Sequence, residues 1–182
     1  MTTFLAGHPY RIGAAAIGFA AAAVLAWYLG SPLFIRTYTN EALPAVSAAP
    51  SAAAAATAAA TAAPATAAQP VARVVAAGEL QFVDSIHNGM GPVQLVALGD
   101  QRFVRFDGVA ITNAPDVHVY LAKETGGKWS DATSLYLGPL KATNGSFNYE
   151  LPSGSAAADY RSVVVWCRQF RVLITWADLK AA

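Results

Sequence analysis

A long uncharged segment near the N-terminus places the strongest constraint on the fold of this chain. The 24 residues from Ile12 to Ile35 contain no charged side chain, and Arg11 and Arg36 bracket them. As an α-helix, this segment would measure about 36 Å, enough to cross a hydrocarbon core of about 30 Å. We therefore predict an N-terminal tail over residues 1–11 and a transmembrane helix over residues 12–35, with the lipid bilayer as its partner.

Aromatic residues stand near both ends of the apolar segment. Tyr10 lies at one edge, and Trp27 and Tyr28 lie near the other, as in the aromatic belts at membrane–water interfaces. A cleaved signal peptide has an apolar core of about 7–15 residues, which this segment exceeds. The pattern favours an uncleaved, single-pass anchor and leaves a cleaved signal peptide as the alternative.

The charges that flank the segment bear on its orientation. Arg11 and Arg36 balance each other, while the N-terminal amine and His8 add positive character on the N-terminal side. Positive charge favours the inner side of the membrane. We expect a protein of the plasma (inner) membrane whose C-terminal part is extracytoplasmic or periplasmic.

The segment after the anchor has a strongly biased composition. Residues 45–68 include 16 alanines among 24 residues, and no charge occurs between Glu41 and Arg73. Prolines at positions 50 and 64 bound the alanine-rich part, which is marginal as an isolated helix. We interpret residues 36–77 as an Ala/Pro/Thr-rich linker that holds a folded domain away from the bilayer.

The composition of the whole chain narrows the classes of function. Charged residues make up 13% of the chain, and the formal net charge is +1. Soluble domains have about 25% charged residues. There is no basic surface of the kind that binds nucleic acid, so no nucleic-acid partner is predicted. The single cysteine excludes a disulfide within the chain.

Apolar and polar side chains alternate through much of residues 78–182. In the segment 116–121, Val117, Val119 and Leu121 share one face, as alternation along a strand requires. Similar alternation covers residues 101–107 and 163–176, with a bulge expected near Arg168, and Gly- or Pro-containing turn signals separate the segments. We predict an all-β domain, a β-sandwich or flattened barrel of several short, mainly antiparallel strands.

No complete enzyme motif occurs in the chain. A phosphate-binding loop, a paired-histidine zinc helix and a serine nucleophile elbow are all missing. Two histidines, His87 and His118, together with Met90 and Cys167 are the residue types of a blue-copper site. No histidine or methionine follows Cys167, however, so no metal site is predicted and the cofactor stays unknown.

Cys167 admits two interpretations. A buried strand cysteine commonly acts as a small apolar residue. A lone thiol in an oxidising compartment, by contrast, indicates a reactive or intermolecular role, and Arg168 and Arg171 nearby favour the thiolate.

Several segments resemble one family, the DM-thirteen domain family. They are Asp84–Gly91, Arg102–Asp107, Asn113–Leu121, Asn148–Pro152 and Tyr160–Phe170. The resemblance covers nearly all of residues 78–179 and none of the anchor or linker. It implies an extracytoplasmic β domain, found beside DOMON domains in animals, with an electron-transfer or redox role that rests on the cysteine corresponding to Cys167.

The leading hypothesis is a membrane-anchored domain with a redox function centred on Cys167 and an unknown redox or protein partner. The candidate ligand-binding residues around it are Asp116, His118, His87 and Trp166. The rival hypothesis is a non-catalytic surface module for binding or adhesion in which the cysteine is structural. Haem or metal binding is a third possibility, and coloured protein would reveal it.

Overall fold

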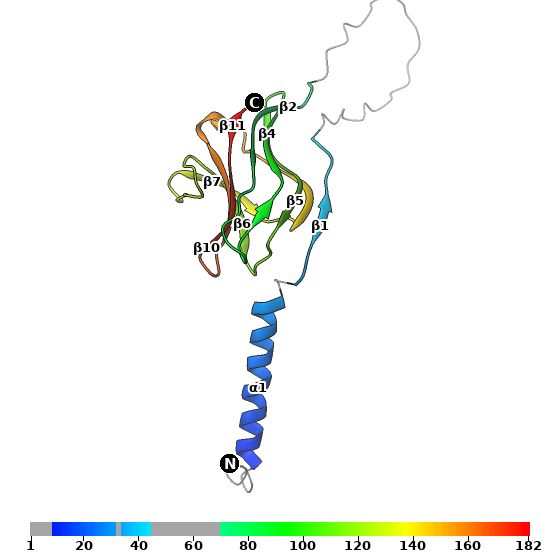
Figure 1. Cartoon of the computed structure of the whole chain (residues 1–182), viewed down its shortest axis with the longest axis vertical. Coiled ribbons are helices and arrows are strands. Elements are labelled where there is room, and N and C mark those ends of the chain that lie inside the picture. The colour runs from blue at the N-terminus through cyan, green and yellow to red at the C-terminus, as the bar shows by residue number, and fades with distance from the viewer. Residues whose placement is uncertain (1–8, 32–33, 45–69) are drawn as a thin grey trace, which may run out of the picture.

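A computed structural model describes residues 9–31, 34–44 and 70–182. It begins with a single helix, α1 (Pro9–Gly30), which projects from a β domain (Figure 1). This helix is long and apolar enough to cross a membrane, and its apolar window is not buried inside the protein. It begins and ends earlier in the chain than the predicted span of residues 12–35. Most of the predicted tail and linker, residues 1–8 and 45–69, lie outside the described residues.

Eleven strands make up the β domain. They are β1 (Tyr38–Asn40), β2 (Arg73–Glu79), β3 (Gly89–Met90), β4 (Pro92–Leu98), β5 (Gln101–Ile111), β6 (Val117–Ala122), β7 (Ser134–Pro139), β8 (Asn144–Glu150), β9 (Ser162–Cys167), β10 (Val172–Asp178) and β11 (Lys180–Ala181). One sheet has the order β1-β8-β5-β4-β2-β11, with β3 paired to β5, and the other has the order β10-β9-β6-β7. The described strands thus form two open sheets, which confirms the predicted all-β sandwich in place of the flattened barrel.

The hydrophobic core lies between the two sheets. The alternating residues Val117, Val119 and Leu121 of β6 all point into it, as their sequence pattern predicts. Phe106 and Phe147 from the seven-stranded sheet stack at 4.9 Å between ring centroids. Burying each such side chain contributes about 1.5–3 kcal/mol to folding, so this layer supplies much of the stability of the domain.

The linker differs from its predicted bounds at both ends. Residues Tyr38–Asn40, expected to be linker, form β1 and pair in parallel with β8. At the other end, β2 begins at Arg73 rather than near Gly78 and pairs with β4. Neither strand gives a clear signal in the sequence, because β1 is only three residues long and the alanines of β2 continue the composition of the linker. Between them, residues 45–69 lie outside the described residues.

Two contacts explain why β1 joins the sheet. Gly145 has a φ of 106°, and a Cβ at this position would overlap the carbonyl of Thr39. Just after β1, the Glu41 carboxylate accepts hydrogen bonds from the Lys141 ammonium at 2.9 Å and the Asn148 amide at 2.8 Å. Partial burial raises the pKa of Glu41, but these hydrogen bonds lower it overall. The chain directly after α1 is therefore fastened to the domain.

The segment 163–176 forms two strands rather than the single interrupted strand that its apolar pattern indicates. Residues 168–171 form the hairpin turn between β9 and β10, where Arg171 adopts a φ of 55°. The bulge predicted near Arg168 is instead a register shift between Leu173 and Thr175 in β10. As a result, Ile174 points into the core while Trp176 lies on the outer face of the sheet.

Candidate functional site

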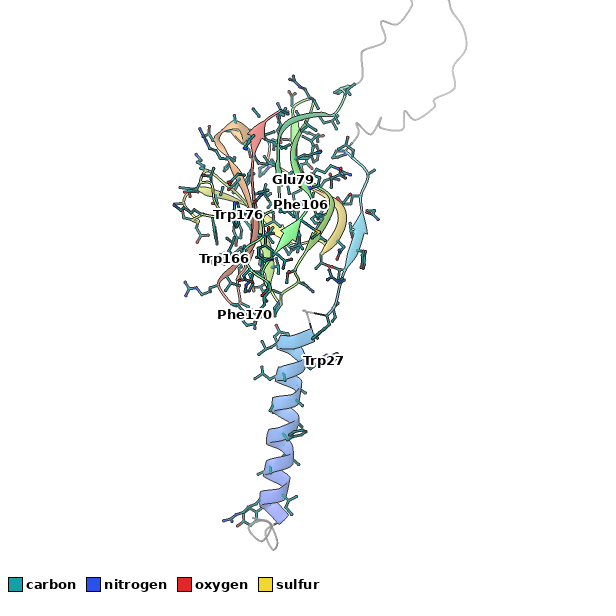
Figure 2. The ribbon with its side chains drawn as sticks, viewed as in Figure 1. Trp27, Glu79, Phe106, Trp166, Phe170 and Trp176 are labelled. Carbon is teal, nitrogen blue, oxygen red and sulfur yellow. The ribbon has the colours of Figure 1, made fainter. Side chains whose placement is uncertain are left out.

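The two faces of β9 carry very different side chains. Cys167 points into the core, has no exposed surface, and pairs in register with Val117 of β6 and Val172 of β10. Trp166, the preceding residue, points to the opposite side and is half-buried (Figure 2). The Cys167 sulfur therefore meets neither solvent nor a partner thiol unless these strands separate, and its redox role stays a prediction.

The outer face of the four-stranded sheet brings together three of the residues singled out in the sequence. His118 of β6 is the direct cross-strand partner of Trp166. Asp116, two residues before His118, reaches its ring with an Oδ1–Nε2 distance of 2.6 Å. Alternation along β6 and the antiparallel register with β9 produce this arrangement, because side chains two residues apart share a face.

The polar contacts of His118 define its protonation pattern. A carboxylate only accepts hydrogen bonds, so the Nε2 atom facing Asp116 carries the proton. In the neutral ring, Nδ1 is then an acceptor, and it lies 2.8 Å from the hydroxyl oxygen of Tyr136 on β7. In this neutral form the Tyr136 hydroxyl donates a hydrogen bond to His118, and a hydrogen-bonded series runs from Tyr136 through His118 to Asp116.

Four aromatic rings continue from Tyr136 across the same face. The ring centroids of Tyr136 and Tyr120 are 5.4 Å apart, and those of Tyr120 and Trp129 are 4.1 Å apart. Trp129 then contacts Trp166 edge-on at 5.4 Å. The two separations of 5.4 Å lie within the usual range of favourable aromatic contacts, and the pair at 4.1 Å is packed more closely. We call these four residues the aromatic row.

Arg168 lies over the Tyr end of the aromatic row. Its guanidinium carbon is 4.5 Å from the ring centroid of Tyr136 and 5.5 Å from that of Tyr120, which places it in cation–π contact with both. Its Nε donates a hydrogen bond of 2.6 Å to the Tyr120 hydroxyl, and this bond raises the pKa of Arg168. A permanent positive charge therefore sits beside both phenols.

The loop that connects β6 to β7 covers part of this face. Gly127 of the loop adopts a φ of 73°, and a Cβ there would collide with Leu173 and press on Trp176. The loop also supplies Trp129, and a cleft of 550 Å³ lies beside this side chain. The cleft is lined by Tyr120, Trp129, Ser130, Asp131, Trp166, Arg168 and Arg171. A planar or anionic group could enter here and touch both aromatic rings and arginine side chains.

His87 lies apart from the outer face, in the loop between β2 and β3. Its Nδ1 contacts Asp84 Oδ2 at 2.8 Å, and the backbone amides of His87 and Ile86 donate to Asp84 Oδ1. The side-chain hydrogen bond from His87 and these backbone bonds lower the pKa of Asp84 to about 2. Within the described part of the chain, His, Cys, Asp and Glu residues form no group of three suited to a metal ion.

The sequence pointed to Trp166 of the aromatic row but did not single out Tyr136 or Trp129. Tyr136 lies in β7, where half-buried and exposed residues mix without clean alternation. Trp129 lies in a loop, where no periodic pattern can locate a side chain. An isolated tryptophan in a glycine-containing loop was the available signal, but its neighbours on the sheet depend on the tertiary structure.

Comparison with known proteins bears on the folded part of the chain. The sequence model of one family, described as electron transfer DM13, matches residues 81–179. Searches against the curated proteins and against the solved structures found no match. The matched residues form more than half of the chain and include every strand except β1, β2 and β11, so the chain belongs to the electron transfer DM13 family.

Proposed function

We propose that this protein is a membrane-anchored, extracytoplasmic domain that transfers single electrons through the outer face of its four-stranded sheet. The observation that carries the proposal is the aromatic row, which begins at a tyrosine hydrogen-bonded to a histidine–carboxylate pair. Membership of an electron-transfer family supports the same class of function. The apolar helix α1 supports the anchor, and the flanking charges described above favour the extracytoplasmic side.

The first step needs a one-electron oxidant, which we take to be the redox centre of a partner protein. The oxidant removes one electron from the Tyr136 ring, and the phenolic proton moves to Nδ1 of His118. The imidazolium keeps its Nε2 proton, which stays hydrogen-bonded to the Asp116 carboxylate. The products are a neutral tyrosyl radical, a charged histidine beside a carboxylate, and the reduced oxidant.

The second step refills Tyr136 from the rest of the aromatic row. An electron moves to the Tyr136 radical from a neighbouring ring, and the proton returns from His118 to the phenolate oxygen. The oxidised ring, which is Tyr120, Trp129 or Trp166, is then a radical cation that keeps its own proton until a reduced partner supplies an electron. The cleft beside Trp129 and Trp166 offers such a partner access to this end of the row.

Cys167 enters the proposal differently from the sequence-based hypothesis. A mechanism centred on its sulfur requires β9 to separate from its neighbours, because the side chain has no exposed surface. Fast thiol labelling of the folded protein would support that mechanism. The contrasting prediction is that Cys167 reacts only after denaturation and that Cys167→Ala keeps full electron transfer through the aromatic row.

A second candidate function uses the same surface for binding alone. Clusters of tryptophan, tyrosine and arginine are typical of the energetic centres of protein interfaces, and the cleft at Trp129 has this composition. In that case Cys167 is a structural residue and the aromatic row makes contacts without changing its oxidation state. The experiment below separates the two functions.

The test is photo-oxidation of the full-length protein in lipid nanodiscs. A photo-excited ruthenium polypyridyl complex with persulfate serves as the one-electron oxidant, and electron paramagnetic resonance measures the tyrosyl radical. We expect a radical whose yield falls several-fold in Tyr136→Phe. His118→Gln should slow its formation, because glutamine cannot take up the phenolic proton.

Tyr160→Phe is the matched control, since Tyr160 is a half-buried tyrosine that lies beside Lys123 rather than in the aromatic row. It should leave the radical yield unchanged. Equal losses in Tyr136→Phe and Tyr160→Phe would contradict the proposal and leave the binding function as the better account of this surface.

A further inference from the structure

The C-terminal end of α1 lies against the base of the β domain. The hydroxyl of Tyr28 donates a hydrogen bond of 3.4 Å to Gln169, in the turn between β9 and β10. Leu29 of the helix and Phe170 of the domain both line a cavity of 150 Å³. Figure 2 shows Phe170 at the lower edge of the domain, close to the end of the helix that carries Trp27. These contacts set the height of the domain relative to the helix.

Three loops form this base, and we call them the basal loops: residues 84–88, 112–115 and 168–171. The strand registers place them at one end, because Gly89 pairs with Ile111 and Val117 pairs with Cys167. The chain that leaves α1 is tied to them, since Asn113 donates a hydrogen bond of 3.1 Å to the Ile35 carbonyl. The basal loops therefore surround the point where α1 meets the domain.

Two large apolar side chains project from the basal loops. Ile86 is 58% exposed and Phe170 is 46% exposed. They flank the 112–115 loop, and each lines a cavity that also contains residues from the end of α1 or the segment after it. Apolar side chains gathered on one end of a domain mark an interaction surface, and the position of α1 identifies what lies there.

The length of α1 sets the depth of the basal loops. Its 22 residues span about 33 Å, close to the thickness of a hydrocarbon core of about 30 Å. Trp27 and Tyr28 at its end are the residue types that occupy the headgroup region. Because Tyr28 contacts Gln169 directly, the turn that carries Phe170 lies at the same depth.

We propose that the basal loops rest in the headgroup region of the bilayer, with Ile86 and Phe170 inserted beside α1. The inference rests on the proposed function only in requiring that α1 span the membrane. Arg171, exposed next to Phe170, adds a positive charge that attracts anionic lipids. The domain then sits on the membrane surface, and Arg168, in the same turn, brings the aromatic row close to that surface.

The buried thiol makes a clean experiment possible. Cys167 is the sole cysteine and has no exposed surface, so a new surface cysteine can be labelled selectively with an environment-sensitive fluorophore. We would label Ile86→Cys and Phe170→Cys in the full chain, reconstituted into vesicles of phosphatidylcholine and phosphatidylglycerol. Part of the lipid carries a nitroxide quencher, near the top of the acyl chain in the vesicles used for positions 86, 153 and 170 and near the end of the acyl chain in those used for position 20.

Two further positions serve as controls. Ser153 is exposed and follows β8, at the end of the domain that lies farthest from α1. A label on Ser153→Cys therefore reports a position away from the basal loops. Ala20→Cys lies in the middle of α1 and reports whether the helix is in the bilayer. Labelling of Cys167 in a variant would show that its substitution had loosened the fold.

The proposal predicts several-fold stronger quenching at positions 86 and 170 than at position 153, together with quenching at position 20. Quenching at 86 and 170 no stronger than at 153, with position 20 still quenched, would overturn the docked arrangement and leave the anchor intact. No quenching at position 20 would overturn the anchor of the proposed function, and the docked arrangement with it. Replacing both Ile86 and Phe170 with serine should reduce the quenching of a label at Ser85→Cys.

Discussion

Consecutive residues of a strand lie on opposite faces of the four-stranded sheet, and the two faces differ in chemistry. The inner face is apolar, and the outer face carries aromatic and charged side chains. On the inner face, Cys167 is sealed between valines of neighbouring strands. On the outer face, Trp166 ends a row of rings that begins at a hydrogen-bonded tyrosine. Because side chains alternate along a strand, neighbours in the sequence are separated by the sheet itself. Proximity in sequence to a reactive-looking residue therefore says little about which side chains act together.

The same comparison explains the polar groups of the domain. Asp116, His118 and Arg168 all lie on the outer side, where they form hydrogen bonds with one another or with tyrosine hydroxyls. The inner side contains almost only apolar side chains. A face that holds charge and oxidisable rings is suited to chemistry, while the inner face is suited to holding the sheets together.

The largest expected contrast between the faces is in stability. Leu121→Ala removes a fully buried side chain from the core and should lower the free energy of unfolding by about 3 kcal/mol. Its neighbour Tyr120 faces outward, and Tyr120→Phe removes one hydrogen bond, worth about 1 kcal/mol or less. Urea denaturation of the two variants measures both. A larger loss in Tyr120→Phe would show that the outer face, not the core, dominates folding.

Substitutions of Cys167 sharpen the contrast within one strand. Cys167→Ala should cost about 1–2 kcal/mol, because it removes one buried atom from a packed core. Cys167→Ser should cost about 1 kcal/mol more than Cys167→Ala, because the buried serine hydroxyl would lose its hydrogen bonds to water without gaining a partner in the core. Denaturant midpoints measure the order of the three proteins. If the serine variant proved as stable as the natural chain, the thiol site would be wetter than its burial indicates.

The smallest expected effect is a change in how stability depends on pH. It compares two tyrosines, one in the core and one on the outer face. Tyr149 lies in the core, donates a hydrogen bond of 2.9 Å to the Pro139 carbonyl, and has its pKa raised by burial. Above a pH of about 10 the unfolded chain ionises this phenol while the folded chain does not. The contribution of the buried Tyr149 phenol to the free energy of unfolding is complete below that pH and is lost as the pH rises further. Tyr149→Phe should therefore show a flatter loss of stability with alkaline pH.

Tyr136→Phe is the companion variant from the outer face. Tyr136 is partly exposed, and removal of its hydroxyl should change the free energy of unfolding at neutral pH by no more than about 0.5 kcal/mol. Denaturation at neutral pH and at several alkaline pH values compares the two variants. An identical pH dependence for Tyr149→Phe and the natural chain would contradict the role assigned to burial.

Much of the architecture could be predicted because it depends on local patterns. The alternation in residues 116–121 correctly placed Val117, Val119 and Leu121 in the core, because alternate side chains of a strand lie on the same face. The apolar composition near the N-terminus correctly indicated a helix of membrane-spanning length. The family resemblance carried by residues 84–170 agreed with the matched family.

Other features escaped because they depend on contacts between distant segments. The strand β1 forms where Gly145, more than a hundred residues away, leaves room for the Thr39 carbonyl. Periodicity could not reveal the turn at residues 168–171, because apolar residues continue at the same spacing into β10. The bulge in β10 then reverses which residues face the core.

The amino-acid sequence alone determined that the chain has an apolar helix, a pleated domain of alternating side chains and a single thiol. These properties follow from composition and period, which act over a few neighbouring residues. Only the tertiary structure decided that the thiol is enclosed while Tyr136, His118 and Trp166 share an open face, and that the basal loops meet the end of α1. Strand pairing and loop packing set those relations, because they join residues that no local pattern connects.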